Sequence, residues 1–157
     1  MKDKGIWRHA GIAFLIALLI YIVAYGWIEH RRHFRGAWRV VFTTNNVNEP
    51  VMIVNQPHLK IEELRIEFRG RTWEGTASPE ERIFDTPKPT PFPVPFGKVI
   101  FMDLTFLPGT VTFDVLGYEI ELLPRTLIIE KKEIPWSEKH IVTLEPQPGN
   151  FTPGAPW

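Results

Sequence analysis

The sequence predicts a single N-terminal transmembrane α-helix followed by an all-β domain, either an antiparallel β-sandwich or a small barrel of about seven to nine strands. Two observations lead to this prediction. The run from Ala10 to Ile28 contains no charged residue, and from Gly36 onward apolar and polar residues alternate with a period of two. A third observation is that the 15 prolines cluster outside the best strand candidates, which is typical of loops and tails.

The uncharged run has the length of a membrane span. Residues 10–28 at a rise of ~1.5 Å each give roughly 28 Å, close to the ~30 Å hydrocarbon core of a bilayer, and residues 1–9 form a short basic flank. The alternative is a cleaved signal peptide, because Ala24-Tyr25-Gly26 resembles a small-x-small cleavage site. The membrane-interface residues that we predict at the two ends of the span are Arg8, His9, Trp27, His30, Arg31, Arg32 and His33.

The predicted helix has two different faces. At ~100° per residue, four alanines fall within an arc of about 60°, four aromatic residues fall on the adjoining arc, and isoleucine, leucine and valine occupy the far side. A partner helix favours such sorting, because small residues let two helix backbones approach closely, whereas lipid does not require it. The predicted helix-interface residues are Ala10, Ala13, Ala17, Ala24, Trp7, Phe14, Tyr21 and Tyr25. Chance clustering is the alternative.

Residues 29–35 are expected to form a basic juxtamembrane collar. Basic residues flank the span on both sides, so the positive-inside count is nearly equal. An uncleaved signal anchor commonly keeps a short basic N-terminus inside, and we therefore expect the β-domain on the periplasmic or extracytoplasmic side. His30 and His33 could ligate a metal or a porphyrin-type cofactor if the helix continued past the membrane. A polar collar at headgroup depth is the alternative, and we predict no cofactor.

Strand patterns recur through residues 36–145, the predicted β-domain. In "AWRVVFTT" the alternating Trp38, Val40 and Phe42 share one face, and "VMIVNQP" is a second short strand. In "LKIEELRIEFRGR" the apolar parity changes at Glu62-Glu63, which predicts a β-bulge, with a helical turn as the alternative. Further strands are expected around residues 118–122, in "RTLIIEKKEIPW" and in "KHIVTLEP".

The clearest hairpin is "VIFMDLTFLPGTVTFDVL". An even-length loop pairs Phe106 with Val111 and gives one apolar face. The same register places Asp103 opposite Asp114, and like charges directly opposite each other on a sheet are unfavourable. Two such carboxylates could bind a hard cation or share a proton as an acid–base pair. The alternative is a solvated face on which they splay apart.

Residues 77–97 form a proline-rich strap. Prolines recur at every second residue from 87 to 95, and such a run prefers an extended polyproline conformation to a place inside a sheet. The strap either docks into an aromatic-lined groove of a partner or lies on its own domain with its phenylalanines packed underneath. The docking candidates are Pro89, Pro91, Phe92, Pro93, Pro95 and Phe96. Residues 146–157 have little to bury, and we expect an extended tail.

Composition and motifs argue against several classes of function. The formal net charge is zero, so there is no electrostatic case for nucleic acid as a partner. The absence of cysteine excludes disulfides, thiolate metal sites and cysteine nucleophiles. The chain carries no sequence motif of α/β-hydrolases, zinc proteases, P-loop proteins, dinucleotide-binding proteins or EF-hands. Its two serines, Ser78 and Ser137, lie in loop sequence, and we do not expect an enzyme.

Two resemblances bear on these expectations. Gly36-Ala37-Trp38 resembles the GxW that opens lipocalin barrels, over three residues and with no second lipocalin motif. The overall plan of one N-terminal helix and a proline-strapped β-domain is similar to that of the H subunit of purple-bacterial photosynthetic reaction centres. That resemblance implies a protein that braces a larger complex without performing chemistry.

The leading hypothesis is a non-catalytic accessory or assembly subunit of a membrane complex, for example a respiratory or photosynthetic one. Its expected partners are integral membrane protein subunits and the lipid bilayer. The alternative is a membrane-tethered β-domain that binds a small hydrophobic ligand or lipid in a cavity beneath Trp38 and Phe101. A third hypothesis is a metal or hydrolytic site at Asp103 and Asp114.

Overall fold

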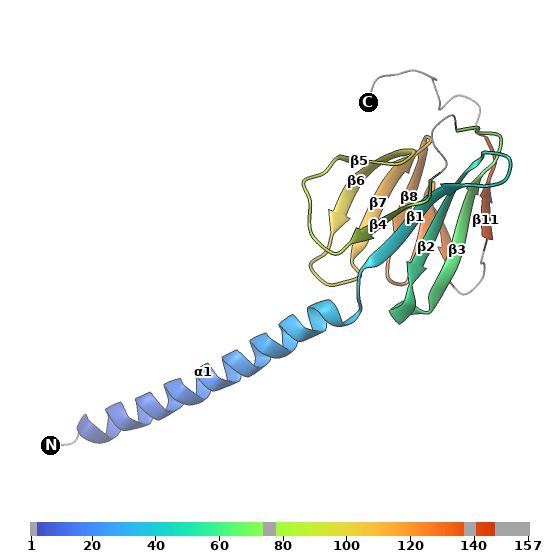
Figure 1. Cartoon of the computed structure of the whole chain (residues 1–157). Helices are drawn as coiled ribbons and strands as arrows, with labels where there is room; N and C mark the ends of the chain where they lie inside the picture. The colour runs from blue at the N-terminus through green and yellow to red at the C-terminus, as the bar shows by residue number, and fades with distance from the viewer. Residues whose placement is uncertain (1–2, 74–77, 137–140, 147–157) are drawn as a thin grey trace. The chain divides into compact units, whose positions relative to one another are not determined.

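The chain consists of one long helix and a β-rich region. The computed structural model describes residues 3–73, 78–136 and 141–146, except for the side chains of residues 3–6 and 32–34. The chain divides into two compact units, Met1–Phe34 and Arg35–Trp157 (Figure 1). The predicted extended tail, residues 146–157, lies outside the described residues apart from Pro146.

The first unit is the helix α1, Asp3–Phe34. Its segment Trp7–Arg31 is long and apolar enough to cross a membrane, although a signal sequence would have the same properties. The helix is longer than the predicted span of residues 10–28, because neither flank contains a helix-breaking proline. It ends where Gly36 adopts a φ of +66°, the left-handed conformation that commonly stops helices at a glycine.

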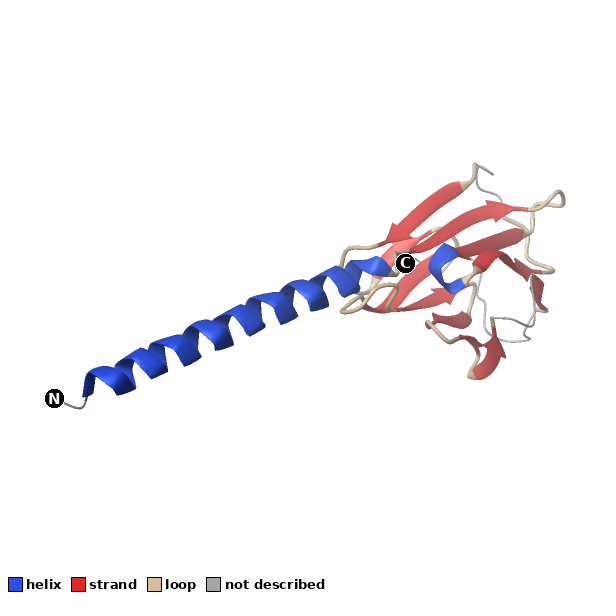
Figure 2. Cartoon of the chain, turned by 90° about the horizontal axis from the view of Figure 1, so that it is seen from below, coloured by secondary structure: helices blue, strands red, loops and turns tan. Residues whose placement is uncertain are grey.

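The length of α1 shows which conformation the predicted basic collar, residues 29–35, adopts. Most of the expected collar belongs to α1, which continues to Phe34. The connection from the end of α1 to the first strand is therefore only Arg35–Ala37. Figure 2 shows this single long helix, one short helical turn in the second unit, and otherwise strands and loops.

The second unit contains eleven strands among its described residues. They are β1 Trp38–Thr44, β2 Pro50–Gln56, β3 Ile61–Phe68, β4 Glu80–Phe84, β5 Phe92–Val94, β6 Gly97–Asp103, β7 Thr110–Val115, β8 Tyr118–Leu122, β9 Thr126–Ile129, β10 Lys132–Pro135 and β11 Ile141–Leu144, with a 3₁₀ turn η1 at Pro57–Leu59. One sheet has the order β11-β3-β2-β1-β4, and the other has the order β10-β9-β8-β7-β6-β5.

The two sheets confirm the β-rich class and correct its details. There is no closed barrel, because each sheet has two different edge strands within the described part of the chain. The structure has more strands than the seven to nine predicted, and one sheet is mixed, since β11 runs parallel to β3. Parallel pairing could not be read from the sequence, because it depends on where the chain returns and not on a local pattern.

The core lies between the sheets. Trp38, Val40 and Phe42 are buried on one face of β1, as the alternation predicted. Phe113 of β7 meets Phe42 of β1 and Phe84 of β4 edge-to-face, with ring centroids 6.3 Å and 5.4 Å away. These aromatic contacts join one sheet to the other and add specific geometry to the burial of apolar area.

The β-bulge predicted in the third strand is confirmed. The pairs Val54–Leu64 and Gln56–Ile61 leave two residues of β3 opposite one residue of β2. Glu63, one of those two, has a φ of +50°, and its N–H donates to the Asn55 side-chain oxygen at 2.8 Å. This bond satisfies a backbone donor that the bulge removes from the sheet.

The strap, residues 77–97, contains two strands that its sequence pattern does not indicate. Strand β4 has four exposed residues and only Phe84 buried, so no alternation marks it. Strand β5 contains Pro93 and forms the edge of its sheet. An edge is where a proline is tolerated, because the missing N–H then faces no neighbouring strand.

Candidate functional site

The first candidate surface is the apolar surface of α1. None of the apolar span Trp7–Arg31 is buried. The four aromatic residues of the predicted interface are exposed, Trp7 at 78%, Phe14 at 67%, Tyr21 at 65% and Tyr25 at 58%. The four alanines of the same face, Ala10, Ala13, Ala17 and Ala24, are exposed as well.

Helical geometry places the predicted interface residues along one side of α1. Tyr21 and Tyr25 stack with their ring centroids 6.1 Å apart, as residues one turn apart do. Ala13 and Ala17 have the same spacing. The strip therefore combines small residues, where another backbone can approach closely, with large flat side chains beside them.

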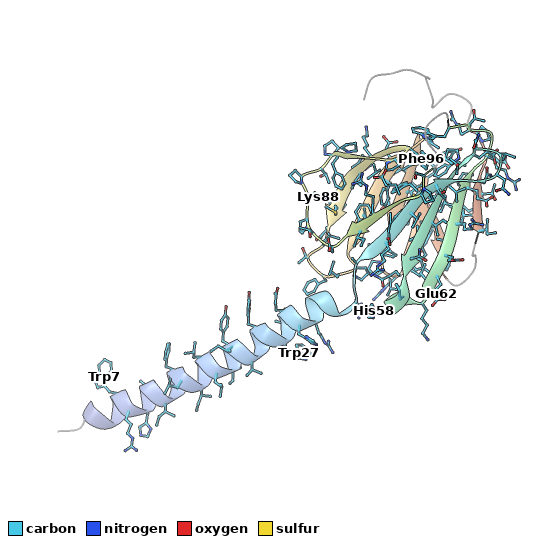
Figure 3. The ribbon with its side chains drawn as sticks, in the orientation of Figure 1. Trp7, Trp27, His58, Glu62, Lys88 and Phe96 are labelled. Carbon is cyan, nitrogen blue, oxygen red and sulfur yellow. The ribbon has the colours of Figure 1, made fainter. Side chains whose placement is uncertain are left out.

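The ends of the span carry the predicted interfacial residues. Figure 3 shows Trp7 and Trp27 near opposite ends of the apolar part of α1. The Arg31 guanidinium lies 4.1 Å from the centre of the Trp27 ring, a cation–π contact that suits the amphipathic boundary of a bilayer. Arg8, His9, His30 and Arg31 are exposed, and the side chains of Arg32 and His33 lie outside the described residues.

The junction between the connection and the β-domain is built around Gln56. This residue is fully buried, and its Nε2 donates to the Ala37 carbonyl at 2.9 Å and to the Gly36 carbonyl at 3.3 Å. Its Oε1 accepts from the His58 N–H at 3.1 Å. One buried amide thus fixes the entering chain to the turn between β2 and β3.

The loop between β6 and β7, residues 104–109, lies at the same end of the β-domain. The Trp38 indole N–H, at the start of β1, donates to the Gly109 carbonyl at 3.0 Å. The Asp103 carboxylate accepts from the Thr105 N–H at 2.9 Å and from its hydroxyl at 2.6 Å. These two bonds, led by the hydroxyl bond, lower the pKa of Asp103.

The predicted register of the β6–β7 hairpin is wrong. Asp103 lies opposite Thr110, and Asp114 lies opposite Lys98. Phe106, expected to pair with Val111, lies in the loop and is 61% exposed. The strand ends at Asp103 because its carboxylate bonds to Thr105 and turns the chain there. A bulge between Val99 and Phe101 shifts the register further.

This register separates the two carboxylates of the third hypothesis. Thr110, the partner of Asp103, is four positions before Asp114 along β7, which is roughly 13 Å along a strand. Asp114 instead approaches the Lys98 ammonium at 3.4 Å. The pair cannot share one cation or one proton, and the described residues contain no group of three or more His, Cys, Asp or Glu that could hold a metal.

The strap packs on its own domain and borders an open cleft. Phe96 is buried and meets Trp73 and Phe42 with ring centroids 4.9 Å and 6.0 Å away. Phe92 packs partly against the core. The cleft has a volume of about 450 Å³, and its described lining includes Trp73, Phe92, Phe96 and the prolines at 91, 93 and 95. Pro89, Pro91 and Pro93 are exposed.

Trp38 and Phe101, beneath which a cavity was expected, do not share one buried face. Trp38 is fully buried, whereas Phe101 is 52% exposed. The bulge in β6 and the shorter β5 leave Phe101 without a neighbouring strand on one side. An apolar hollow of the β-domain lies at the strap.

Comparison with known proteins assigns no relative to this chain: no family model matches it, and no curated protein or solved structure gives a significant match.

Three residues that shape these surfaces were not predicted from the sequence. Gln56 occurs in a strand whose polar residues read as solvent-facing, and nothing marks it as buried. Trp73 follows the end of β3 without a periodic pattern, and only its size could have suggested packing. Phe106 was predicted to face the core because the strand was expected to continue to Phe106, with residues 107–110 as the loop.

Proposed function

We propose that this protein is a non-catalytic accessory or assembly subunit of a membrane protein complex. In this proposal α1 spans the bilayer and packs its alanine/aromatic face, the eight interface residues named above, against integral membrane subunits. The β-domain stands at the membrane surface on the periplasmic or extracytoplasmic side and contacts the same complex.

The observation that carries the proposal is the sorted surface of α1. Within the described chain, none of its apolar span is buried. Its four alanines lie together, and six branched aliphatic residues lie on the far side at ~100° per residue: Ile12, Leu15, Ile16, Leu19, Ile22 and Val23. A simple tether needs apolarity but no such separation of small, aromatic and branched residues. Packing against a partner helix would explain this separation.

The β-domain supports the proposal in a second way. Its interior is filled by aromatic and aliphatic side chains, and the carboxylate pair suggested for chemistry is far apart. Its entry from α1 is short and is fixed by Gln56. These features suit a rigid body that contacts neighbouring subunits from a defined distance above the membrane.

Isolation of the full chain from its native membranes in a mild detergent tests the proposal. We expect the wild-type chain to co-migrate with integral membrane subunits, and the double variant Ala13→Leu/Ala17→Leu to lose most of them, because each leucine holds the backbones apart. Leu15→Phe/Leu19→Phe is the matched control, since it also adds three carbon atoms at each of two positions but lies on the far face. Recovery of the wild type as a free monomer would sink the proposal.

A second candidate function is binding of a small apolar molecule in the strap cleft. The aromatic and proline lining of that cleft is the observation that favours it, since such a lining is typical of ligand pockets. Titration with an environment-sensitive apolar dye tests this function. We expect saturable binding to the wild type and weaker binding to Trp73→Ala, and unsaturable binding or equal affinities would exclude the cleft.

A further inference from the structure

We propose that the β6–β7 loop makes a second contact with the lipid bilayer by placing Phe106 in the interfacial layer. This inference rests on the proposed anchoring of α1 in a membrane. It adds a contact that anchoring alone does not require, and it identifies the lipid surface, and not a protein, as the partner of this loop.

The loop lies at the end of the β-domain where the chain enters. Strand β1 begins at Trp38, directly after the connection, and the Trp38 indole bonds to the Gly109 carbonyl at the end of the loop. The turn that contains His58 lies at this end too, and Figure 3 shows His58 and Glu62 near one end of the β-domain and Phe96 toward the other.

The short connection limits how far this end can be from the membrane. Arg35–Ala37 can span about 10 Å when fully extended. The last turn of α1 after Arg31 adds roughly 5 Å. The sum, roughly 15 Å, is an upper limit, and it is about twice the thickness of the headgroup layer, which is about 5–8 Å on each side. Any connection that is not fully extended brings the entry end closer to that layer. Loops at the entry end are therefore within reach of the interface.

The residues around Phe106 fix the conformation of the loop and leave Phe106 exposed. Leu104 and Leu107, on either side of it, are buried in the core. Gly109 has a φ of +68°, and a Cβ there would lie 2.2 Å from the Asp103 carbonyl oxygen. With the bonds from Thr105 to Asp103, these contacts fix the loop from both ends while Phe106 remains 61% exposed.

Apolar burial, and not charge, drives the proposed contact. The exposed charges of this end have both signs. Arg35, Lys60 and Arg125 are positive, and Glu62, Glu63, Asp85 and Asp103 are negative. They offer no net attraction to anionic lipid. Phe106 and Phe101, both on the β6–β7 hairpin, are exposed aromatic residues, and aromatic rings favour the membrane interface. We therefore expect the contact to form on neutral phosphatidylcholine.

Site-specific fluorescence in vesicles tests the contact. The chain has no cysteine, so Arg125→Cys, in the adjacent β8–β9 turn, accepts a single environment-sensitive dye and leaves Phe106 in place. The labelled full chain is reconstituted in phosphatidylcholine vesicles that carry a nitroxide quencher on the headgroup. Val47→Cys, in the turn between β1 and β2 at the other end, is the matched exposed control, and Leu19→Cys reports insertion of α1.

We expect the label at position 125 to be quenched and the label at position 47 to be unquenched. Phe106→Asp should abolish the quenching at position 125. If position 125 behaves as position 47 does while the label at position 19 is buried in lipid, the loop contact is refuted and the anchor stands. Quenching that survives Phe106→Asp refutes the role of Phe106. A label at position 19 that remains in water refutes the anchoring itself, and with it the proposed function.

Discussion

Gln56 shows how a single polar side chain can decide the geometry of a junction. Its amide is fully buried, and it bonds to the two residues that precede β1 and to the turn after β2. A buried amide is stable only when its donors and acceptors have partners. Those partners here belong to the connection from α1, so satisfying Gln56 also fixes where the chain enters the β-domain.

Gln56→Leu should destabilise the β-domain by about 1–3 kcal/mol, because the Ala37 carbonyl and the His58 N–H would lose their partner. Urea denaturation of the full chain in detergent, followed by tryptophan fluorescence, measures the change. Arg39→Leu, on the exposed face of β1, is the control and should change stability by less than about 0.5 kcal/mol. Equal stability of the two variants would show that the amide network is unimportant.

Two carboxylates, the exposed Asp103 and the half-buried Glu49, give the domain a small acid sensitivity. The Thr105 hydroxyl and N–H lower the pKa of Asp103, and the Gly70 N–H with the Asn45 amide lowers the pKa of Glu49. A group whose pKa is lower in the folded state stabilises that state above its unfolded pKa. This stabilisation disappears as the pH falls through the folded pKa.

The free energy of unfolding should therefore decline as the pH falls below about 4. The decline should be shallower in Asp103→Asn and Glu49→Gln, since neither amide titrates. Urea midpoints measured at several pH values between neutrality and the acid limit would check this. If both variants showed the same pH dependence as the wild type, Asp103 and Glu49 would not be the source of the acid sensitivity.

At the scale of elements, β6 shows why a strand can be predicted while its partners are not. Its apolar residues were recognised in the sequence, but the predicted register was wrong. The turn at Asp103 and the bulge near Phe101 shift the pairing away from the predicted one. Alternation fixes which residues share a face, yet register depends on turn chemistry and bulges. The bulge at Glu63 was predictable because it leaves a parity change in the sequence itself.

Gly97 marks a close approach between β6 and β7. A Cβ at this position would lie 2.0 Å from the Asp114 carbonyl oxygen and 2.9 Å from the Val115 Cα. Both are backbone atoms of the neighbouring strand, and they cannot move without disturbing the pairing of Gly97 with Val115.

Gly97→Ala should accordingly lower the free energy of unfolding by about 1–3 kcal/mol, the usual cost of overpacking. Gly26→Ala in α1 is the control, because among the described residues nothing beyond its chain neighbours and its own helix backbone lies within 4 Å of the new Cβ. The same urea experiment compares the two variants. If Gly97→Ala were as stable as Gly26→Ala, the two strands would have to be further apart than described.

At the scale of the whole molecule, the sequence predicted the two-part plan more reliably than the surface sites. Helix α1 and the β-rich region follow from apolar runs and period-two alternation, which are local signals. The parallel pairing of β11, the strap cleft at Trp73 and the exposed Phe106 arise from contacts between distant segments. No single stretch of sequence encodes them, and the Asp103/Asp114 site failed for the same reason.

The account as a whole depends on what covers the alanine/aromatic face of α1. A face of small and aromatic residues that remained in lipid would leave its sorting without a physical reason. A partner helix on that face would explain why the small and aromatic residues are sorted. It would also explain why the connection to the β-domain is short, because the β-domain would then have to stay close to the same partner. The orientation of this face is therefore the quantity to measure.

Site-specific photo-crosslinking in native membranes measures it most directly. A photoreactive phenylalanine analogue at Tyr21 lies on the alanine/aromatic face, and the same analogue at Leu19 lies on the far face. The account predicts protein adducts of defined mass from position 21 and only lipid adducts from position 19. Lipid adducts alone from both positions would contradict it.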